Sequence, residues 1–403
     1  MASITQKESE IRYYRLADRI SRISVSAVRE ILKVTERPDV ISFAGGLPAP
    51  ELFPVEEFAE AHARVFAEAG AAAMQYSTTE GWGPLREWVA DRCRKRGIAT
   101  SADCVLITSG SQQGIDLAAK VFIDQGDAVI VENPCYLAAL QAFGSYGASF
   151  IAVDSDDEGM RVDQVEEALK RSDAKLIYIV SDFHNPKGTS LSLERRKRLI
   201  ELSRQYQTPI VEDDPYAETR FAGEMPPPLA SFDEDGLVIY LSTFSKTLSP
   251  GMRVGWAAIS KELMRAMVVA KQASDLHTST IQQRAAARLL ESFDYDGHIS
   301  RIRKVYEERC HTMLAAIEDY FPAGSRAARP EGGLFIWVEL PDQIICERLL
   351  KEALRLKVAF VPGAPFFAEN PRHNFARLNF SNSQPEVIFE GIRRISEAMK
   401  GML

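Results

Sequence analysis

The strongest constraint on the fold is an alternation of short, apolar, β-rich runs with helical stretches between residues 103 and 272. Seven such runs occur in order: CVLIT, AVIVEN, SFIAVDS, KLIYIVSDF, PIVEDD, LVIYLSTFS and RVGWAAI. Nearly continuous apolar strands linked by helices are typical of parallel sheets buried on both faces. We therefore expect an α/β fold with a mostly parallel, seven-stranded sheet between helices.

The flanking segments predict a smaller α+β unit. Residues 301–320 and 348–356 have helical patterns, GGLFIWVEL and RLNFS have strand patterns, and ISFAGGLP near the N-terminus indicates a strand and turn. We expect a large domain of residues 51–285 and a small C-terminal domain of residues 286–403. Residues 1–50 are expected to belong to the small domain and to form a lid over the functional site.

Composition excludes several function classes. The formal net charge is −8, and no run of Lys or Arg is long enough to follow a nucleic-acid backbone. The five cysteines lie far apart without metal-site spacing, which favours reduced structural thiols and no metal. No segment has the roughly 20 apolar residues of a membrane span or a signal-peptide core. We expect a cytoplasmic protein without nucleic-acid or membrane partners.

Ligands of such sheets collect at the carboxyl ends of the strands, and two loops there carry suitable residues. SGSQQ, residues 109–113, lies between a strand and a helix, where backbone N–H groups and the helix dipole can bind an anion. A simple helix cap would look the same. SDFHNPKG, residues 181–188, follows another strand; its position distinguishes Asn185 from a residue of a plain loop.

Two further strand ends carry ionisable groups. In VEDDPY, a carboxylate at the mouth of the sheet implies a cation or proton donor nearby, so Asp213 and Tyr216 are candidate ligand contacts, while Asp214 could equally cap the next segment. In STFSKTLSPGMRVGW, Lys246 follows a strand, with hydroxyl groups nearby and Arg253 seven residues later. This setting suits an amine of depressed pKa that forms an imine beside a bound phosphate. A surface lysine is the alternative.

Taken in order, these motifs resemble the fold-type I pyridoxal-5'-phosphate (PLP) enzymes, specifically the class I/II aminotransferases, over nearly the whole chain. SAVREIL, ISFAGGLPAPELFP, QYSTTEGWGPLRE, TSGSQQGIDL and VAFVPGAPFF are most similar to the branch of 2-aminoadipate, kynurenine and bacterial multi-substrate aminotransferases. The resemblance implies that PLP is the cofactor.

The resemblance also implies roles around the cofactor ring. Lys246 would hold PLP and move a proton between the substrate and the cofactor. Asp213 would pair with the pyridine nitrogen, Asn185 and Tyr216 would donate to the phenolate oxygen, and Tyr136 would stack on the ring. The implied phosphate cradle consists of small, hydroxyl and cationic residues: Ser109, Gly110, Ser111, Gln112, Thr243, Ser245 and Arg253.

Other roles concern the substrate and a second subunit. Arg377 in ARLNFS would clamp the substrate α-carboxylate, although a solvated strand arginine is the alternative, and Gly46 and Asn185 would lie beside it. Arg29 would meet a distal substrate carboxylate, unless it is a helix-surface arginine in an ion pair. Tyr76 would reach the phosphate of a neighbouring subunit, which implies a homodimer with shared active sites.

One residue departs from the family pattern. The family usually has Thr where this chain has Lys187, and we expect the Lys187 side chain to lie in solvent.

The expected reaction moves an amino group from an L-amino acid to a 2-oxo acid, with 2-oxoglutarate as the candidate acceptor, by a ping-pong mechanism. A lyase, a decarboxylase or an oxidase on the same scaffold would keep nearly every motif. A non-catalytic PLP-binding effector domain of a transcription regulator is a weaker alternative, because GGLP begins by Gly45 and leaves no room for a preceding DNA-binding module.

Overall fold

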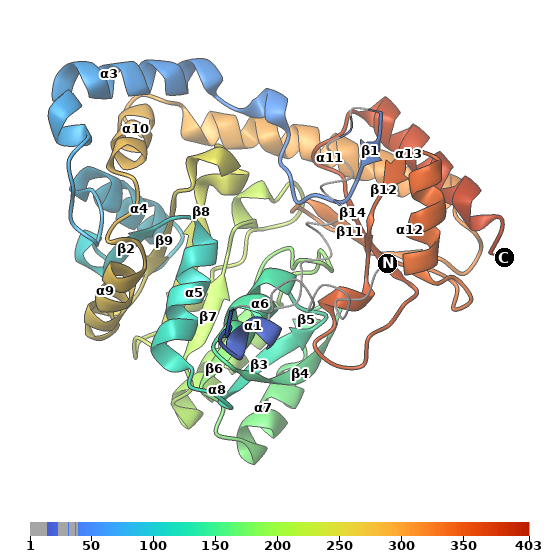
Figure 1. Cartoon of the computed structure of the whole chain (residues 1–403), viewed down its shortest axis with the longest axis horizontal. Coiled ribbons are helices and arrows are strands. Elements are labelled where there is room, and N and C mark those ends of the chain that lie inside the picture. Colours follow the sequence, from blue (N-terminus) through green and yellow to red (C-terminus); the bar gives the residue numbers. More distant parts are fainter. Residues whose placement is uncertain (1–13, 23–30, 32–36, 38, 403) are drawn as a thin grey trace.

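An eight-stranded mixed sheet forms the centre of the larger part of the chain (Figure 1). The computed structural model describes residues 14–22, 31, 37 and 39–402. The strands lie in the order β2-β9-β8-β7-β6-β3-β4-β5. Their bounds are β2 (Val105–Thr108), β3 (Ala128–Asn133), β4 (Ser149–Asp156), β5 (Gly159–Met160), β6 (Leu176–Ile179), β7 (Ile210–Asp213), β8 (Val238–Thr243) and β9 (Gly255–Ala258). Seven of these are the expected strands, and the two-residue β5 adds an eighth at the edge.

Strand directions bring the expected functional loops to one edge of the sheet. β3, β4, β6, β7 and β8 run parallel, whereas β9 is antiparallel to both β8 and β2. β2 and β8 therefore point the same way. The strands β2, β6, β7, β8 and β9 are buried along their whole length, which explains their uninterrupted apolar sequences.

Helices pack against this sheet and against each other. α5 contacts β2, β7, β8 and β9 on the sheet and also α6 and α9, whereas α3 packs along α10. The helices of this part are α3 (Val55–Ala73), α4 (Gly83–Lys95), α5 (Ser111–Phe122), α6 (Leu137–Ser145), α7 (Val162–Arg171), α8 (Leu193–Tyr206), α9 (Lys261–Asp275) and α10 (Thr280–Leu290), and a short α1 (Arg19–Arg22) lies against α6.

The smaller part is an α+β unit at the other side of the view in Figure 1. Four strands pair antiparallel in the order β10-β11-β14-β13, and β1 pairs in parallel with β12. The bounds are β1 (Ile41–Ser42), β10 (Arg326–Ala327), β11 (Phe335–Glu339), β12 (Val358–Ala359), β13 (Val361–Pro362), β14 (Phe375–Asn379), α11 (Tyr295–Tyr320), α12 (Cys346–Arg355) and α13 (Pro385–Met399). The N-terminal segment thus joins a strand near the C-terminus, and the long α11 runs between the two parts.

Helix α11 begins six residues before the helical stretch expected from the sequence. The Asp294 side chain caps this helix by accepting a hydrogen bond from the backbone N–H of Gly297 at 2.9 Å. This cap satisfies one of the N–H groups that the first turn leaves free. Gly297 has a low helix propensity, which weakens the helical pattern of this first turn in the sequence.

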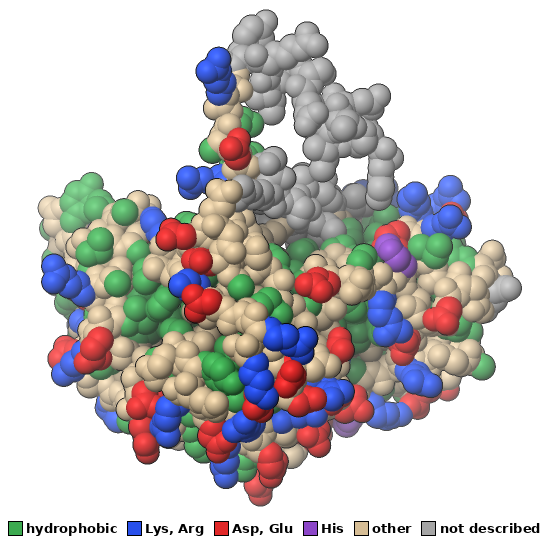
Figure 2. All heavy atoms as spheres, turned by 90° about the horizontal axis from the view of Figure 1, so that it is seen from below, with side chains coloured by type: hydrophobic (Ala, Val, Ile, Leu, Met, Phe, Trp, Pro, Cys, Tyr) green, Lys and Arg blue, Asp and Glu red, His purple; other side chains and the backbone are tan. Residues whose placement is uncertain are grey.

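The surface shows mixed charge. On the face in Figure 2, Lys and Arg side chains lie interspersed with Asp and Glu and form no continuous basic track. Within the described residues, no helix combines the length and apolar character that a membrane crossing requires. In the same part of the chain, no three His, Cys, Asp or Glu side chains are grouped so that they could hold a metal ion.

Candidate active site

Lys246 lies in a single turn, Phe244–Lys246, that directly follows strand β8. The Thr243 hydroxyl oxygen accepts a hydrogen bond from the backbone N–H of Ser245 at 3.1 Å, which fixes this turn. Lys246 Nζ donates a hydrogen bond to the carbonyl oxygen of Gly46 at 2.8 Å. The amine is therefore held between the sheet edge and the N-terminal segment.

The surroundings of Lys246 favour its neutral form. Burial lowers the pKa of the Lys246 amine to about 8, and the positive charges of Arg377 and Arg253 contribute to this lowering, whereas Asp213 opposes it. An amine of this pKa is a far better nucleophile near neutrality than an ordinary lysine. Asp213, Arg253 and Arg377, which come from three parts of the sequence, thus all influence the pKa of the Lys246 amine.

The turn between β2 and α5 lies beside the Lys246 turn because of strand β9. Gly255, the first residue of β9, pairs with both Thr108 and Thr243. A Cβ atom on Gly255 would come within 2.7 Å of the carbonyl carbon of Gly110. Only glycine at position 255 allows the two turns to approach this closely.

Arg253 supplies a cation at the same turn. Its Nη2 atom donates to the carbonyl oxygen of Ser109 at 3.0 Å, and a Cβ atom on Gly110 would come within 2.7 Å of Nη2. Gly110 also has φ of 84°, a conformation that favours glycine. The first N–H groups of α5, which begins at Ser111, have no partner within the helix. Together with the guanidinium they suit an anion such as phosphate.

The side chains of two members of the expected phosphate cradle make hydrogen bonds to neighbouring helices and loops. The Ser109 hydroxyl donates to Oδ2 of Asp275 at 3.1 Å, so it is held by α9. Gln112 donates through Nε2 to the carbonyl oxygen of Ala138 at 3.2 Å and accepts from the Tyr136 hydroxyl at 3.4 Å. Gln112 therefore connects α5 to the segment that carries Tyr136.

Asp213 ends strand β7 and is buried. The Tyr178 hydroxyl donates to Oδ2 of Asp213 at 2.9 Å. Oδ1 of Asp213 has no hydrogen-bond partner in the described part of the chain. Burial raises the pKa of Asp213 to about 7, while the bond from Tyr178 and the charge of Lys246 oppose this rise. A buried carboxylate oxygen without a donor is costly, which indicates that a ligand supplies one.

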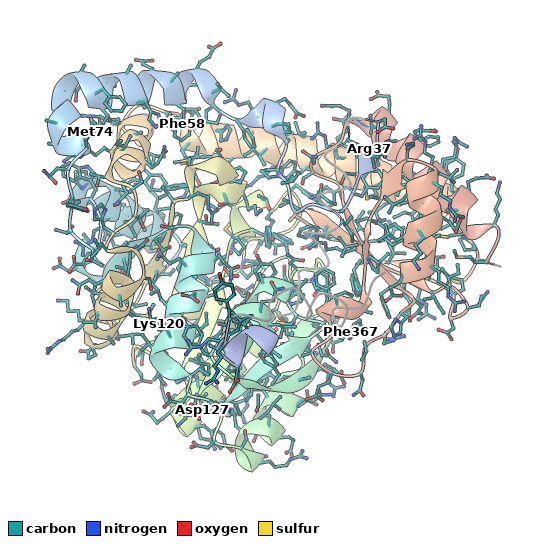
Figure 3. The ribbon with its side chains drawn as sticks, in the orientation of Figure 1. Arg37, Phe58, Met74, Lys120, Asp127 and Phe367 are labelled. Atoms are coloured by element: carbon teal, nitrogen blue, oxygen red, sulfur yellow. The ribbon has the colours of Figure 1, made fainter. Side chains whose placement is uncertain are left out.

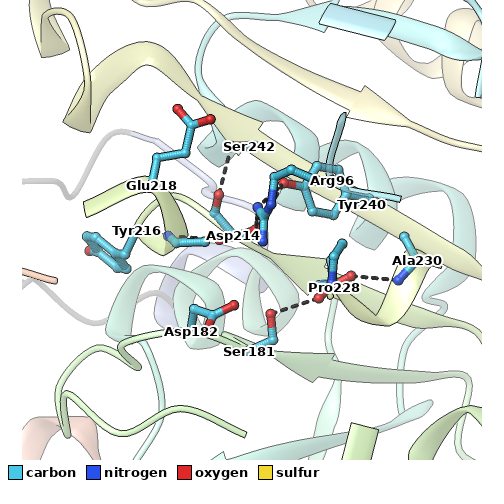
Figure 4. Close-up of polar contacts among 12 residues, drawn as sticks. Arg96, Ser181, Asp182, Asp214, Tyr216, Glu218, Pro228, Ala230, Tyr240 and Ser242 are labelled. Carbon is cyan, nitrogen blue, oxygen red and sulfur yellow. Dashed lines mark hydrogen bonds and ion pairs between the residues drawn. The ribbon is translucent and has the colours of Figure 1, made fainter. Parts of the chain in front are cut away.

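Asp214 holds the turn that carries Tyr216. Figure 4 shows Arg96 and Tyr240 converging on the Asp214 carboxylate, and the Tyr240 hydroxyl donates to Oδ2 at 2.9 Å. Oδ1 of Asp214 accepts from the backbone N–H of Ala217 at 3.1 Å. Of the two roles open from the sequence, the structure shows capping of the next segment.

Arg377 lies on β14 of the smaller part but reaches the edge of the large sheet. It donates through Nη1 to Oδ1 of Asn185 at 2.8 Å and through Nη2 to the carbonyl oxygen of Ala44 at 2.6 Å. Its guanidinium carbon lies 4.2 Å from the ring centroid of Phe335 and 5.0 Å from that of Phe366. Burial lowers the pKa of Arg377 to about 10. The solvated strand arginine considered from the sequence is excluded.

The expected ring-binding tyrosines lie near this arginine. Tyr216 is buried, and its ring packs edge-on against Phe335 with centroids 6.1 Å apart. Burial raises the pKa of Tyr216 well above its usual value, while a hydrogen bond with Asn185 opposes this. Tyr136, at the start of α6, also influences the pKa values of Tyr216 and Arg377. The structure therefore groups Tyr136, Asn185 and Tyr216 around Arg377.

Solved structures and curated proteins resemble the whole chain. An α-aminoadipate aminotransferase from Thermus thermophilus, complexed with N-(5'-phosphopyridoxyl)-L-leucine, has a TM-score of 0.90 and 42% identity over 96% of this chain and 97% of that one. A kynurenine aminotransferase from Pyrococcus horikoshii, in complex with PMP, has a TM-score of 0.92 and 42% identity over 99% of both chains. Aromatic-amino-acid aminotransferase 1 from Thermococcus litoralis is 45% identical over 94% of this chain and 92% of that protein.

The family described as "Aminotransferase class I and II" matches residues 38–395. The chain belongs to this aminotransferase family. It is a PLP-dependent enzyme that transfers amino groups, as the resemblance in its motifs predicted.

The residues of this aminotransferase fit PLP. The unpaired Oδ1 atom of Asp213 suits a protonated pyridine nitrogen, and the start of α5 with Arg253 suits a phosphate. The amine of Lys246, with its lowered pKa, suits an aldehyde. These three features differ in chemistry, and each matches a different group of the same cofactor.

The Tyr76 side chain does not enter the candidate site of its own chain. The Tyr76 side chain is 78% exposed, and its ring meets the edge of the His277 ring at a centroid distance of 5.8 Å. Arg29 lies outside the described residues.

The expectation that Lys187 lies in solvent is wrong. Lys187 Nζ donates to the carbonyl oxygens of Ser155 at 2.7 Å and Asp156 at 3.0 Å, and also contacts the Ser155 hydroxyl at 3.1 Å. The ammonium group thus satisfies carbonyl groups at the end of β4, and burial lowers its pKa. In this aminotransferase, Lys187 ties the Asn185 loop to the neighbouring part of the sheet.

Tyr178 and Phe335 are site residues that the sequence did not reveal. Tyr178 lies inside the apolar strand KLIYIV, and Phe335 lies inside GGLFIWVEL. Both resemble ordinary core residues of strands, so no local signal could have distinguished them.

Proposed function

We propose that Lys246 carries PLP in this aminotransferase and that the residues around it hold the cofactor. The observation that supports this most is the convergence of Arg253, Asp213 and Arg377 on the Lys246 amine, each of which influences its pKa. Arg253 with the start of α5 would bind the phosphate, and Asp213 would bind the pyridine nitrogen. Asn185 and Tyr216 would bind the phenolate oxygen, with Tyr136 packed on the ring face.

Lys246 would also move the proton during the reaction. When bound, PLP supplies an aldehyde and a ring that accepts electrons when a bond at the substrate α-carbon breaks. The freed Lys246 amine would take the proton from the α-carbon and return it to the cofactor carbon. Its lowered pKa suits both steps, because the neutral amine is needed as a base and the cation as an acid.

Arg377 would bind the α-carboxylate of the substrate. Its contacts with Asn185 and Ala44 hold the guanidinium in one orientation before substrate arrives, and two aromatic rings exclude water from its faces. A fixed, planar cation suits a carboxylate that must be held while the α-proton is removed.

We propose a ping-pong exchange in which 2-oxoglutarate is the amino acceptor. The donor classes favoured by similarity are aromatic amino acids, 2-aminoadipate and kynurenine, which the names of the similar aminotransferases contain. A distal carboxylate would be met by Arg29, which remains a prediction.

A homodimer is proposed from Tyr76. Its exposed side chain would reach the phosphate of a neighbouring subunit and so complete that site. The division into residues 1–50, 51–285 and 286–403, and a cytoplasmic location, also remain predictions. The pairing of β1 with β12 supports the assignment of the N-terminal segment to the small domain.

The decisive experiment for this proposal follows the visible absorbance of the bound cofactor while single L-amino acids are added without an acceptor. A true donor converts the cofactor to its amine form, and subsequent 2-oxoglutarate restores the original spectrum. Parallel double-reciprocal lines are expected when both substrates vary. A cofactor spectrum unchanged by every amino acid, or release of ammonia or carbon dioxide without an acceptor, would contradict the proposal.

A further inference from the structure

A fully buried lysine lies behind the phosphate-binding turn. Lys271 on α9 has 0% exposure. Its Nζ atom donates to both carboxylate oxygens of Asp275, at 2.7 and 2.9 Å, to Oε1 of Gln113 at 3.1 Å and to the Thr278 hydroxyl at 3.1 Å. A buried ammonium group with this many acceptors is fully compensated, and it lies outside the residues proposed to touch PLP.

The partners of Lys271 converge on Ser109. Oδ2 of Asp275 accepts from the Ser109 hydroxyl at 3.1 Å and from Nε2 of Gln113 at 2.8 Å. Oε1 of Gln113 accepts from the backbone N–H of Ser109 at 2.7 Å. The Gln113 amide is therefore fixed at both ends, and two polar groups of Ser109 are engaged by the network.

The network decides which groups of the turn remain for an anion. The third polar group of Ser109, its carbonyl oxygen, accepts from Arg253. With Ser109 fixed at all three groups, Gly110 and the start of α5 present the N–H groups that have no intrahelical partner. The orientation of these N–H groups and of Arg253 thus depends on Ser109. The orientation of Ser109 depends in turn on Asp275 and Gln113.

The charge of Lys271 has a second consequence. Asp275 places a carboxylate behind a position proposed to hold a phosphate, and like charges in a poorly hydrated region repel each other. Burial alone would raise the pKa of Asp275, but hydrogen bonds from Lys271 and Gln113 and the charge of Lys271 lower it, so the carboxylate is ionised. The adjacent ammonium cancels this charge.

We propose that Lys271 and Asp275 form a positioning pair that orients the Ser109–Ser111 turn for the cofactor phosphate, acting through Ser109 and Gln113 without touching PLP. This inference rests on the proposed function, because it assumes that the turn binds the phosphate of PLP. It gives Ser109 a different role from the one expected from the sequence, since the serine hydroxyl holds the turn and does not bind the phosphate.

The test compares the binding of PLP with that of pyridoxal, which has the same aldehyde and ring but no phosphate. Both dissociation constants are measured with full-length protein stripped of cofactor. The Lys271→Met variant is expected to bind PLP about tenfold more weakly, the equivalent of losing about one oriented hydrogen bond to a charged group. Its affinity for pyridoxal should stay the same, because the aldehyde and ring contacts remain.

Lys120→Met is the matched control. Lys120 on α5, labelled in Figure 3, also bridges to α9, through the carbonyl oxygen of Ala270 at 3.3 Å and the Ser274 hydroxyl at 2.9 Å, but it does not contact the Ser109 turn. The Lys120→Met variant should bind both PLP and pyridoxal as tightly as the wild type does. If Lys271→Met weakens the binding of PLP and of pyridoxal equally, or leaves the preference for PLP unchanged, the proposal is overturned.

Removal of the lysine alone leaves Asp275 without its cation, so a double variant, Lys271→Met with Asp275→Asn, covers the case in which the single variant does not fold. The double variant has no unpaired buried charge and should show the same selective loss of PLP affinity. If the double variant instead prefers PLP over pyridoxal as strongly as the wild type does, the positioning role is contradicted. Wild-type protein that binds PLP no more tightly than pyridoxal would instead contradict the phosphate cradle, and with it the proposed function.

Discussion

Arg377 and Asn185, which lie 192 residues apart in the sequence, are joined by a hydrogen bond of 2.8 Å between Nη1 and Oδ1. The bond connects strand β14 of the smaller part to the loop after β6 at the edge of the large sheet. The residue proposed to bind the substrate carboxylate is thus held by a residue proposed to bind the cofactor. Under these proposed roles, substrate binding and cofactor binding would share this contact.

Arg377→Lys should raise the KM for the amino donor about 10- to 100-fold, because hydrogen bonds to a charged partner contribute about 1.5–3 kcal/mol each. Lysine keeps the charge but loses the planar fork. The absorbance of the bound cofactor should not change. Arg372→Lys is the control: Arg372 also lies over an aromatic ring, that of Phe375, but pairs at the surface with Glu339. An unchanged KM in Arg377→Lys would contradict the assigned role.

Capture of PLP by the stripped protein should accelerate with rising pH and level off above about 8. The pKa of Lys246 is lowered to about 8, and only the neutral amine attacks an aldehyde. At pH 7 about a tenth of the amine is neutral, whereas an ordinary lysine would be almost fully charged. Stopped-flow absorbance measures the rate. A rate that still rises about tenfold per pH unit from pH 8 to pH 10 would show that the pKa is not lowered.

Tyr178→Phe should lower kcat about tenfold at neutral pH, because Asp213 loses a hydrogen bond that stabilises its ionised form. Burial already raises the pKa of Asp213 to about 7, and loss of this hydrogen bond raises it further. The acidic limb of the pH–rate profile should therefore move to higher pH. Tyr146→Phe removes a comparable bond to Asp116 elsewhere and should change neither value. A lower kcat with an unmoved acidic limb would indicate a packing role for Tyr178.

Arg96→Met should destabilise the protein by about 3–5 kcal/mol, because it leaves the buried Asp214 carboxylate without its cation. Thermal unfolding measures the loss. Arg94→Met removes an exposed ion pair with Asp91 and should cost less than about 1 kcal/mol. Equal stability of the two variants would contradict the importance of the contacts around Asp214 shown in Figure 4.

The sequence predicted the sheet, and with it the position of several candidate site residues at one edge, because apolar strands leave local patterns. Apolar runs revealed the long strands, and the residues after them, such as Asp213 and Lys246, therefore had to lie at one edge. The two-residue β5 is too short to give such a pattern, and the start of α11 was obscured by Gly297.

Contacts between distant segments could not be predicted from the same patterns. Lys187 was expected in solvent because a lysine in a loop usually is, yet carbonyl groups at the end of β4 bind it. The Ser109 hydroxyl donates to Asp275, which is 166 residues away in the sequence, and no local pattern indicated this contact. Tyr178 likewise gave no signal, because its hydroxyl partner lies on the neighbouring strand.

Borohydride reduction of the purified enzyme, followed by mass spectrometry of its peptides, tests most directly whether Lys246 carries the cofactor. We predict a single phosphopyridoxyl adduct on Lys246 and none in the Lys246→Ala variant. Protein that takes up no PLP, or an adduct on another lysine that persists in Lys246→Ala, would contradict this prediction.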